Sequence, residues 1–104
     1  MCDVMQKRKA AIRYFEPEVM HRLEDLPNIG KEIAEDLRAI GIKTPQSLKG
    51  KDPLMLYKKI CAYQGQRIDP CLLDVMMAVV AFAGGAPSNP WWFFTPERKK
   101  LYKV

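Results

Sequence analysis

A short segment in the first third of the chain most constrains how it can fold. Residues 26–30 read LPNIG and are followed by apolar residues at helical spacing. Pro27 cannot donate a hydrogen bond, so a helix before it should stop near Leu26. Asn28 tolerates the left-handed backbone conformation that a tight turn needs, and Gly30 adopts it freely. The segment therefore predicts two helices joined by a tight hairpin.

The start of the second of these helices offers groups that an anion could bind. We expect the amides of Ile29, Gly30 and Lys31 to face outward at the positive end of the helix dipole, a setting that suits a phosphate or carboxylate. This pattern resembles the helix-hairpin-helix motif of proteins that grip the nucleic-acid backbone, and here it covers about residues 17–41. The motif usually has a glycine where Asn28 stands.

Length and composition predict one domain that spans residues 1–104. Of the 104 residues, 48% are hydrophobic, which is enough for one modest core. The N-terminus does not resemble a signal peptide, and the most apolar run, residues 70–86, falls short of the ~20 residues that span a bilayer. We therefore expect a cytoplasmic protein without a membrane partner, in which the three cysteines stay reduced.

The distribution of charge tells more than the net value of +5. Residues 16–36, which include the hairpin, contain seven acidic residues and two basic ones, whereas residues 37–68 contain seven basic residues and one acidic one. The hairpin that should touch phosphate thus lies in the most acidic part of the chain. The bases that follow it could form a second phosphate-contacting surface or a solvated charged face: Lys43, Lys49, Lys51, Lys58, Lys59 and Arg67.

Helix signals recur along the chain, and strand signals are nearly absent. Several prolines follow a residue that can cap a helix, which is typical of helix starts. We predict an all-α domain of five to six helices, over residues 3–14, 17–26, 29–40, 45–48, 53–63 and 70–83. In the helix over 53–63, Leu56, Ile60 and Tyr63 should face the core. The helix over 70–83 is apolar nearly all round and should be the central one.

Two parts of the sequence resemble known families. The hairpin together with residues 44–48 (TPQSL) is similar to the helix-hairpin-helix core of the SAM-like C-terminal domain of the competence regulator TfoX. Later segments resemble the small bacterial pathogenicity-locus proteins, also labelled mitomycin resistance proteins: Asp52-Pro53 to Tyr57, Cys61, Gly65, Asp69-Pro70-Cys71, Pro90-Trp91-Trp92 to Thr95, Arg98 and Lys99. The resemblance implies a helical domain that binds DNA, and it supplies no catalytic residues.

Four consecutive aromatic residues, Trp91 to Phe94, form a second candidate site. They could stack on exposed bases, bind a protein partner or a second copy of the chain, or close the core. Four neighbours on a helix cannot all face inward, so we expect about two to pack inside and at least one to be exposed.

Catalytic and metal-binding patterns are missing from the sequence. There is no nucleophile–base set, glycine-rich phosphate loop or paired-carboxylate motif, so we expect no enzyme and no cofactor. His21 is the only histidine, and Cys61 and Cys71 lack the spacing of a zinc site. Both cysteines should fill the core, although a thiol that sequesters a reactive small molecule is an alternative. Asp74 should lie at the wet edge of its helix or pair with a base such as Arg67.

These observations favour a small non-enzymatic protein that binds DNA through backbone phosphates without sequence preference, linked to resistance to mitomycin or DNA damage. Its contacts would come from Asn28, Ile29, Gly30, Lys31, Lys43, Lys49 and Lys51. The alternative is a protein-interaction or dimerisation module that uses Trp91 and Trp92 and binds no nucleic acid.

Overall fold

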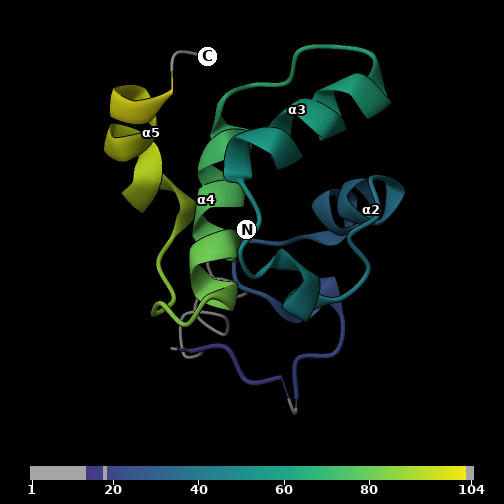
Figure 1. The fold of residues 1–104 in the computed structure, drawn as a ribbon, viewed down its shortest axis with the longest axis vertical. Coiled ribbons are helices and arrows are strands. Elements are labelled where there is room, and N and C mark those ends of the chain that lie inside the picture. The colour runs from purple at the N-terminus through teal and green to yellow at the C-terminus, as the bar shows by residue number, and fades with distance from the viewer. Residues whose placement is uncertain (1–13, 18, 103–104) are drawn as a thin grey trace.

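A computed structural model describes residues 14–17 and 19–102, and their regular structure is entirely helical (Figure 1). In chain order the elements are η1 (Leu23–Asp25), α2 (Lys31–Ala39), η2 (Pro45–Leu48), α3 (Pro53–Gln64), α4 (Cys71–Ala83), η3 (Trp91–Phe94) and α5 (Thr95–Leu101), where η marks a 3-10 helix. No strand occurs in these ranges, which confirms the all-α prediction. The helix predicted over residues 3–14 falls almost wholly outside the described residues.

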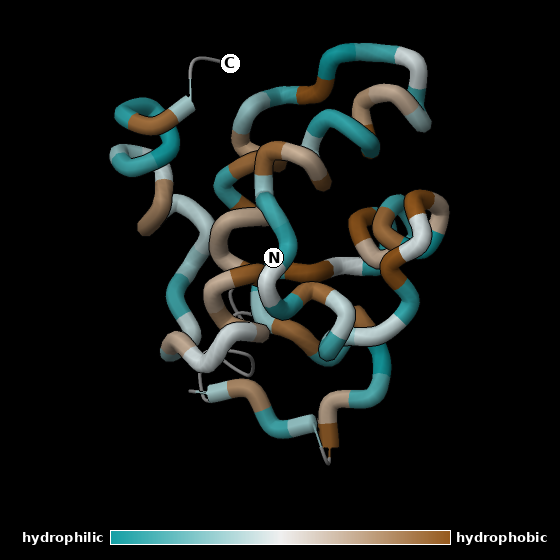
Figure 2. The backbone as a smooth tube through the Cα atoms, in the orientation of Figure 1, coloured by the Kyte–Doolittle hydropathy of each residue, from teal (hydrophilic) through white to brown (hydrophobic). Residues whose placement is uncertain are grey.

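Helix α4 is the centre of the core, as its apolar sequence predicts. Ten of its thirteen residues are buried. It packs against α3, η2, η3 and α5, and Figure 1 shows it between α5 on one side and α3 and α2 on the other. Figure 2 shows hydrophobic residues along α4 and in the segments that cross it, and mainly hydrophilic residues on α5. Among the described residues, no helix is both long and apolar enough to cross a membrane.

The first helix of the predicted hairpin is much shorter than expected. Instead of a helix over 17–26, the structure has the single 3-10 turn of η1. The Asp25 carboxylate accepts hydrogen bonds from the backbone amides of His21 (3.1 Å) and Arg22 (3.0 Å), which removes these amides from a helical pattern. The prediction of a full first helix is therefore wrong, and a complete helix-hairpin-helix motif is not confirmed.

Helix α3 begins and ends close to the prediction, but one inward residue was misassigned. The Asp52 side chain caps the helix by accepting from the Leu54 amide at 3.1 Å, and the chain leaves the helix at Gly65 with φ 72°. Tyr57 is buried, whereas Tyr63 is 61% exposed. Burial of a tyrosine favours a partner for its hydroxyl, and Tyr57 has one because it donates to the Ile68 carbonyl.

Among the described residues, one carboxylate lies inside the core, and two groups from the C-terminal segment hold it. Asp74 is fully buried; it accepts from Thr95 Oγ1 at 2.6 Å and from Arg98 Nε at 2.8 Å. The hydrogen bond to Asp74 also raises the pKa of Arg98 above its ordinary value. The expectation of a basic partner is confirmed, but the partner is Arg98 on α5, not Arg67. This network therefore ties α5 to α4.

We expect Arg98→Met to lower the free energy of unfolding by about 3 kcal/mol, because it leaves the buried Asp74 charge without its cation. Urea denaturation measures the change. The matched control Lys99→Met, on the exposed side of the same helix, should stay within about 0.5 kcal/mol of the parent. The double variant Asp74→Leu/Arg98→Met should recover most of the loss. Equal stability of the two single variants would contradict this account.

Candidate nucleic-acid interface

The turn between η1 and α2 is anchored in the core and adopts the predicted backbone at one of its two special positions. Leu23, Leu26 and Ile29 are fully buried and recur at every third residue. Asn28 has φ 70°, the left-handed conformation expected of it. Gly30 does not: it is the extended N-cap of α2, with φ −96°. That part of the prediction is wrong, and the backbone at residue 30 does not require a glycine.

The exposed amides at this turn are fewer than expected. The Ile29 amide donates to the Leu26 carbonyl at 3.4 Å, because the turn closes on itself. Gly30 and Lys31 are exposed, and their amides have no hydrogen-bond partner among the described residues. A Cβ built on Gly30 would meet nothing within 4 Å. Of the three predicted amides, those of Gly30 and Lys31 therefore remain without a partner among the described residues, at exposed positions of the N-terminus of α2.

The Asn28 side chain connects this turn to the aromatic segment. Its Nδ2 donates to the Asn89 carbonyl at 2.8 Å, and its Oδ1 accepts from the Trp91 amide at 3.1 Å. These bonds, which we call the Asn28 clamp, span 61 and 63 residues of sequence. From the sequence, the turn and the tryptophans are two separate candidate sites. In the structure, these hydrogen bonds connect them. The one signal in the sequence was an asparagine where the motif usually has a glycine.

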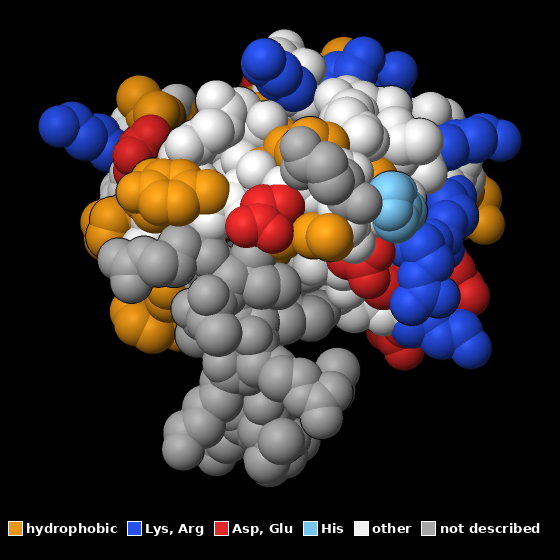
Figure 3. Space-filling view, turned by 90° about the horizontal axis from the view of Figure 1, so that it is seen from below, with side chains coloured by type: hydrophobic (Ala, Val, Ile, Leu, Met, Phe, Trp, Pro, Cys, Tyr) orange, Lys and Arg blue, Asp and Glu red, His pale blue; other side chains and the backbone are white. Residues whose placement is uncertain are grey.

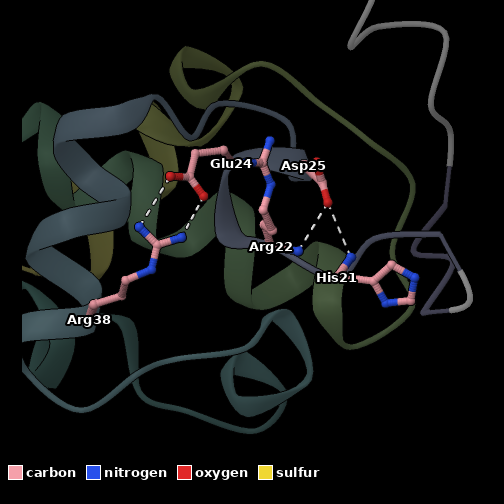
Figure 4. A network of polar contacts seen from close by, with 5 residues as sticks. All are labelled: His21, Arg22, Glu24, Asp25 and Arg38. Carbon is pink, nitrogen blue, oxygen red and sulfur yellow. Dashed lines mark hydrogen bonds and ion pairs between the residues drawn. The ribbon is translucent and has the colours of Figure 1, made fainter.

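Several acidic groups near the turn are occupied by partners within the protein. Arg38 forms a two-pronged ion pair with Glu24, in which Nη1 donates to Oε2 at 3.1 Å and Nη2 to Oε1 at 2.6 Å (Figure 4). These hydrogen bonds lower the pKa of Glu24 to about 2. Figure 4 also shows Asp25 bonded to the backbone of His21 and Arg22. The Asp36 carboxylate accepts from Gln64 Nε2 on α3 at 3.0 and 3.1 Å.

Two carboxylates of α2 remain exposed beside the open amides. Glu32 follows Lys31 in the first turn of the helix, and Glu35 lies one turn further on. Neither forms an ion pair with another described residue. The anion-accessible turn therefore has one cation, Lys31, and one nearby acid in its first turn.

Most of the described basic residues without a carboxylate partner are lysines, and Arg22 and Arg67 are the others. All eight described lysines are exposed, and none forms an ion pair with another described residue. The predicted contact lysines other than Lys31 come from two later places in the chain. Lys43 lies four residues after the C-terminal end of α2, and Lys49 and Lys51 flank Gly50 before α3. Figure 3 shows basic and acidic side chains mixed on the side of α2, opposite the hydrophobic side chains near η3 and α5.

The aromatic segment divides into two inward and two outward rings, as predicted. Trp91 and Phe94 are half-buried against the core. Trp92 is 58% exposed and Phe93 57% exposed. The Phe93 and Phe94 rings meet edge to face with centroids 5.2 Å apart. Of the two tryptophans proposed to bind a partner, only Trp92 presents most of its ring to solvent.

Of the two described cysteines, Cys71 does not have the surroundings of a reactive thiol. Cys61 and Cys71 are unpaired and half-buried. A hydrogen bond to Asp69 raises the pKa of the Cys71 thiol above its ordinary value, which lowers the fraction of nucleophilic thiolate. Within the described ranges, no group of three or more His, Cys, Asp or Glu residues could hold a metal ion. His21 is exposed.

Taken together, these features define a small all-helical protein with an exposed basic surface and an aromatic segment clamped to a buried turn. Residues 16–100 match the family described as "Cdd1: Pathogenicity locus", and the chain belongs to this family. The chain is also similar to "Mitomycin resistance protein McrB" from Streptomyces lavendulae, with 47% identity over 79 residues that cover 76% of this chain and 75% of that protein. No solved structure matches. The family resemblance drawn from the sequence is confirmed, while the likeness to the TfoX domain stays a prediction.

We expect Asn28→Gly to lower the free energy of unfolding by about 2 kcal/mol, because it removes two hydrogen bonds worth about 1 kcal/mol each and keeps the left-handed backbone accessible. Asn28→Ala should cost about 1–2 kcal/mol more, since alanine resists that conformation. Urea denaturation measures both. Asn89→Ala is the control, because it keeps the carbonyl that the clamp uses. If Asn28→Gly is no less stable than Asn89→Ala, the clamp does not stabilise the fold.

The ion pair of Glu24 should make stability depend on pH. The folded pKa of about 2 lies below the ordinary 4.5, so the pair stabilises the folded state fully above about pH 4.5 and loses that effect as the pH falls toward 2. We expect Arg38→Gln to be less sensitive to acid than the parent over this window in urea titrations. Lys43→Gln, which removes an unpaired charge, should keep the parental slope. If the unfolding free energies of Arg38→Gln and the parent change with pH in parallel, the ion pair does not cause the pH dependence.

Proposed function

We propose that this protein is a non-enzymatic, cytoplasmic accessory protein that binds DNA through its backbone phosphates without sequence preference. The observation that carries the proposal is the large number of exposed basic residues that have no carboxylate partner among the described residues. Two of the four described arginines, Arg38 and Arg98, are paired with carboxylates of the protein, whereas Arg22, Arg67 and all eight described lysines are exposed and form no ion pair with another described residue. Exposed cations that lack internal partners are available to release counterions from a polyanion.

The open turn supports a specific phosphate contact within this general attraction. The Gly30 and Lys31 amides lie at the positive end of α2, and the missing side chain at Gly30 lets a backbone approach closely. The Lys31 side chain adds a charge at the same place. Glu32 weakens the attraction, so the other lysines must contribute most of the affinity. Phosphate contacts of this kind position a protein on DNA but do not read sequence.

We extend the proposal to resistance against mitomycin, on the printed name of the similar Streptomyces lavendulae protein. DNA binding by this chain can be tested independently of any effect on the drug. The alternative is a protein-interaction or dimerisation module without nucleic-acid binding, and the exposed rings of Trp92 and Phe93 are the observation that favours it.

The test is fluorescence anisotropy with a labelled duplex of arbitrary sequence at several salt concentrations. We expect a Kd on the order of 10⁻⁴–10⁻⁶ M at physiological salt, with affinity falling as salt rises. Lys31→Ala should reduce the slope of log K against log salt by about 1, and Lys31→Glu should weaken binding further. Lys100→Glu is the matched charge reversal away from the turn and should weaken duplex binding less.

A second variant separates the amides from the charge. Gly30→Val covers the amides with a side chain, yet the negative φ and the open space at residue 30 should leave the fold intact. We expect it to weaken duplex binding without a change in unfolding temperature. Duplex affinity that does not change with salt concentration would contradict the proposal. Parental affinity in both Gly30→Val and Lys31→Glu would also contradict it. A concentration-dependent mass without DNA binding would favour the alternative.

A further inference from the structure

Residues 91–101 form one continuous helical run in which η3 leads directly into α5, and this run has two distinct faces. The inner face presents residues at helical spacing that are buried or half-buried: Trp91, Phe94, Thr95 and Arg98. The outer face consists of exposed residues: Trp92, Phe93, Pro96, Glu97, Lys99, Lys100 and Leu101. The core side of the run is thus already filled by its own aromatic and polar contacts.

Two large rings on the outer face lie mostly in solvent. Trp92 and Phe93 leave 58% and 57% of their surface in contact with solvent. We call these two residues the aromatic face. Aromatic side chains of 150–250 Å² each are costly to leave in water and are typical of binding surfaces.

The aromatic face is fixed to the rest of the protein at both ends of the run. The Asn28 clamp holds the amide of Trp91, one residue before Trp92. Hydrogen bonds from Thr95 and Arg98 to Asp74 hold the first two turns of α5. A rigid platform loses less conformational freedom when a ligand binds to it.

The charge around the aromatic face indicates the chemistry of its ligand. Lys99 and Lys100 lie seven residues after Trp92 and Phe93, which places them on the same side about 10 Å further along the helix. Both are exposed and form no ion pair with another described residue, and Glu97 is the one acid on this face. A ligand that combines flat apolar groups with negative charge matches this arrangement.

We propose that the aromatic face is a stacking platform for the unpaired bases of single-stranded DNA, with Lys99 and Lys100 binding its phosphates. Base–aromatic stacking combined with a basic track is the usual chemistry of single-strand binding. This inference rests on the proposed DNA binding and names its substrate class, a strand whose bases are not paired. A second copy of the chain is a poorer occupant, since two rings that are little more than half exposed fall well short of the ~800 Å² per partner of a stable interface.

The test compares a labelled mixed-sequence single strand with a hairpin duplex of the same length, using the full chain and fluorescence anisotropy. We expect Trp92→Ala to weaken single-strand binding about 5- to 150-fold and to leave duplex binding unchanged. The matched control is Tyr63→Ala, which removes an equally exposed ring, 61% accessible, from α3. Trp92→Phe should retain most of the affinity, and Lys100→Glu should weaken single-strand binding and make it less dependent on salt.

Each outcome decides between this inference and the proposed function. Equal single-strand affinity of Trp92→Ala and Tyr63→Ala would overturn the stacking platform. So would a concentration-dependent mass in analytical ultracentrifugation that Trp92→Ala abolishes, because the face would then bind a second copy. Duplex binding without single-strand binding would overturn the platform and leave the proposed function intact. If the protein binds neither the single strand nor the duplex, both the stacking platform and the proposed function are wrong.

Discussion

The arrangement of this small protein depends on one side chain that does two things at once. Asn28 supplies the left-handed backbone that lets the chain turn into α2, with φ 70°. Its amide group also bonds to the backbone at Asn89 and Trp91, more than sixty residues away. A glycine would satisfy the backbone requirement but could not make these bonds. The position of η3, and therefore the direction in which α5 leaves it, follows from a residue in the first third of the chain.

Polar groups inside the fold follow a consistent pattern. The fully buried Asp74 requires a donor or cation, because an unpaired charge in the core is costly, and Thr95 and Arg98 provide both. Nearer the surface, Arg38 forms a bidentate ion pair with Glu24. Guanidinium groups suit such planar contacts, whereas lysine ammonium groups remain well hydrated. Two of the four described arginines thus stabilise the structure, while Arg22, Arg67 and the described lysines stay exposed and set the charge that other molecules meet.

Local signals in the sequence predicted the elements that depend on local chemistry. Helix α4 followed from its uniformly apolar residues, the start of α3 from Asp52-Pro53, and the two inward rings of Trp91–Phe94 from helical geometry. The wrong predictions concern places where a side-chain contact competes with the locally expected structure, and such a contact leaves no local pattern in the sequence. The Asp25 carboxylate accepts hydrogen bonds from two backbone amides that would donate to carbonyls within a helix over 17–26. Tyr57 is buried in place of Tyr63, and its hydroxyl bonds to the carbonyl of Ile68. The partner of Asp74 depends on how α5 packs against α4. The candidate site was predicted as two separate parts, since nothing near Asn28 in the sequence points to Trp91.

The Asn28 clamp also has a thermodynamic consequence. The open amides at Gly30 lie two residues from Asn28, and Trp92 lies one residue beyond the amide that Asn28 holds. Binding at the turn and binding at the ring would therefore be coupled, and each would change the affinity of the other site by the same factor. Under the proposals above, a strand that contacts both places would bind two sites that are linked through a single carboxamide.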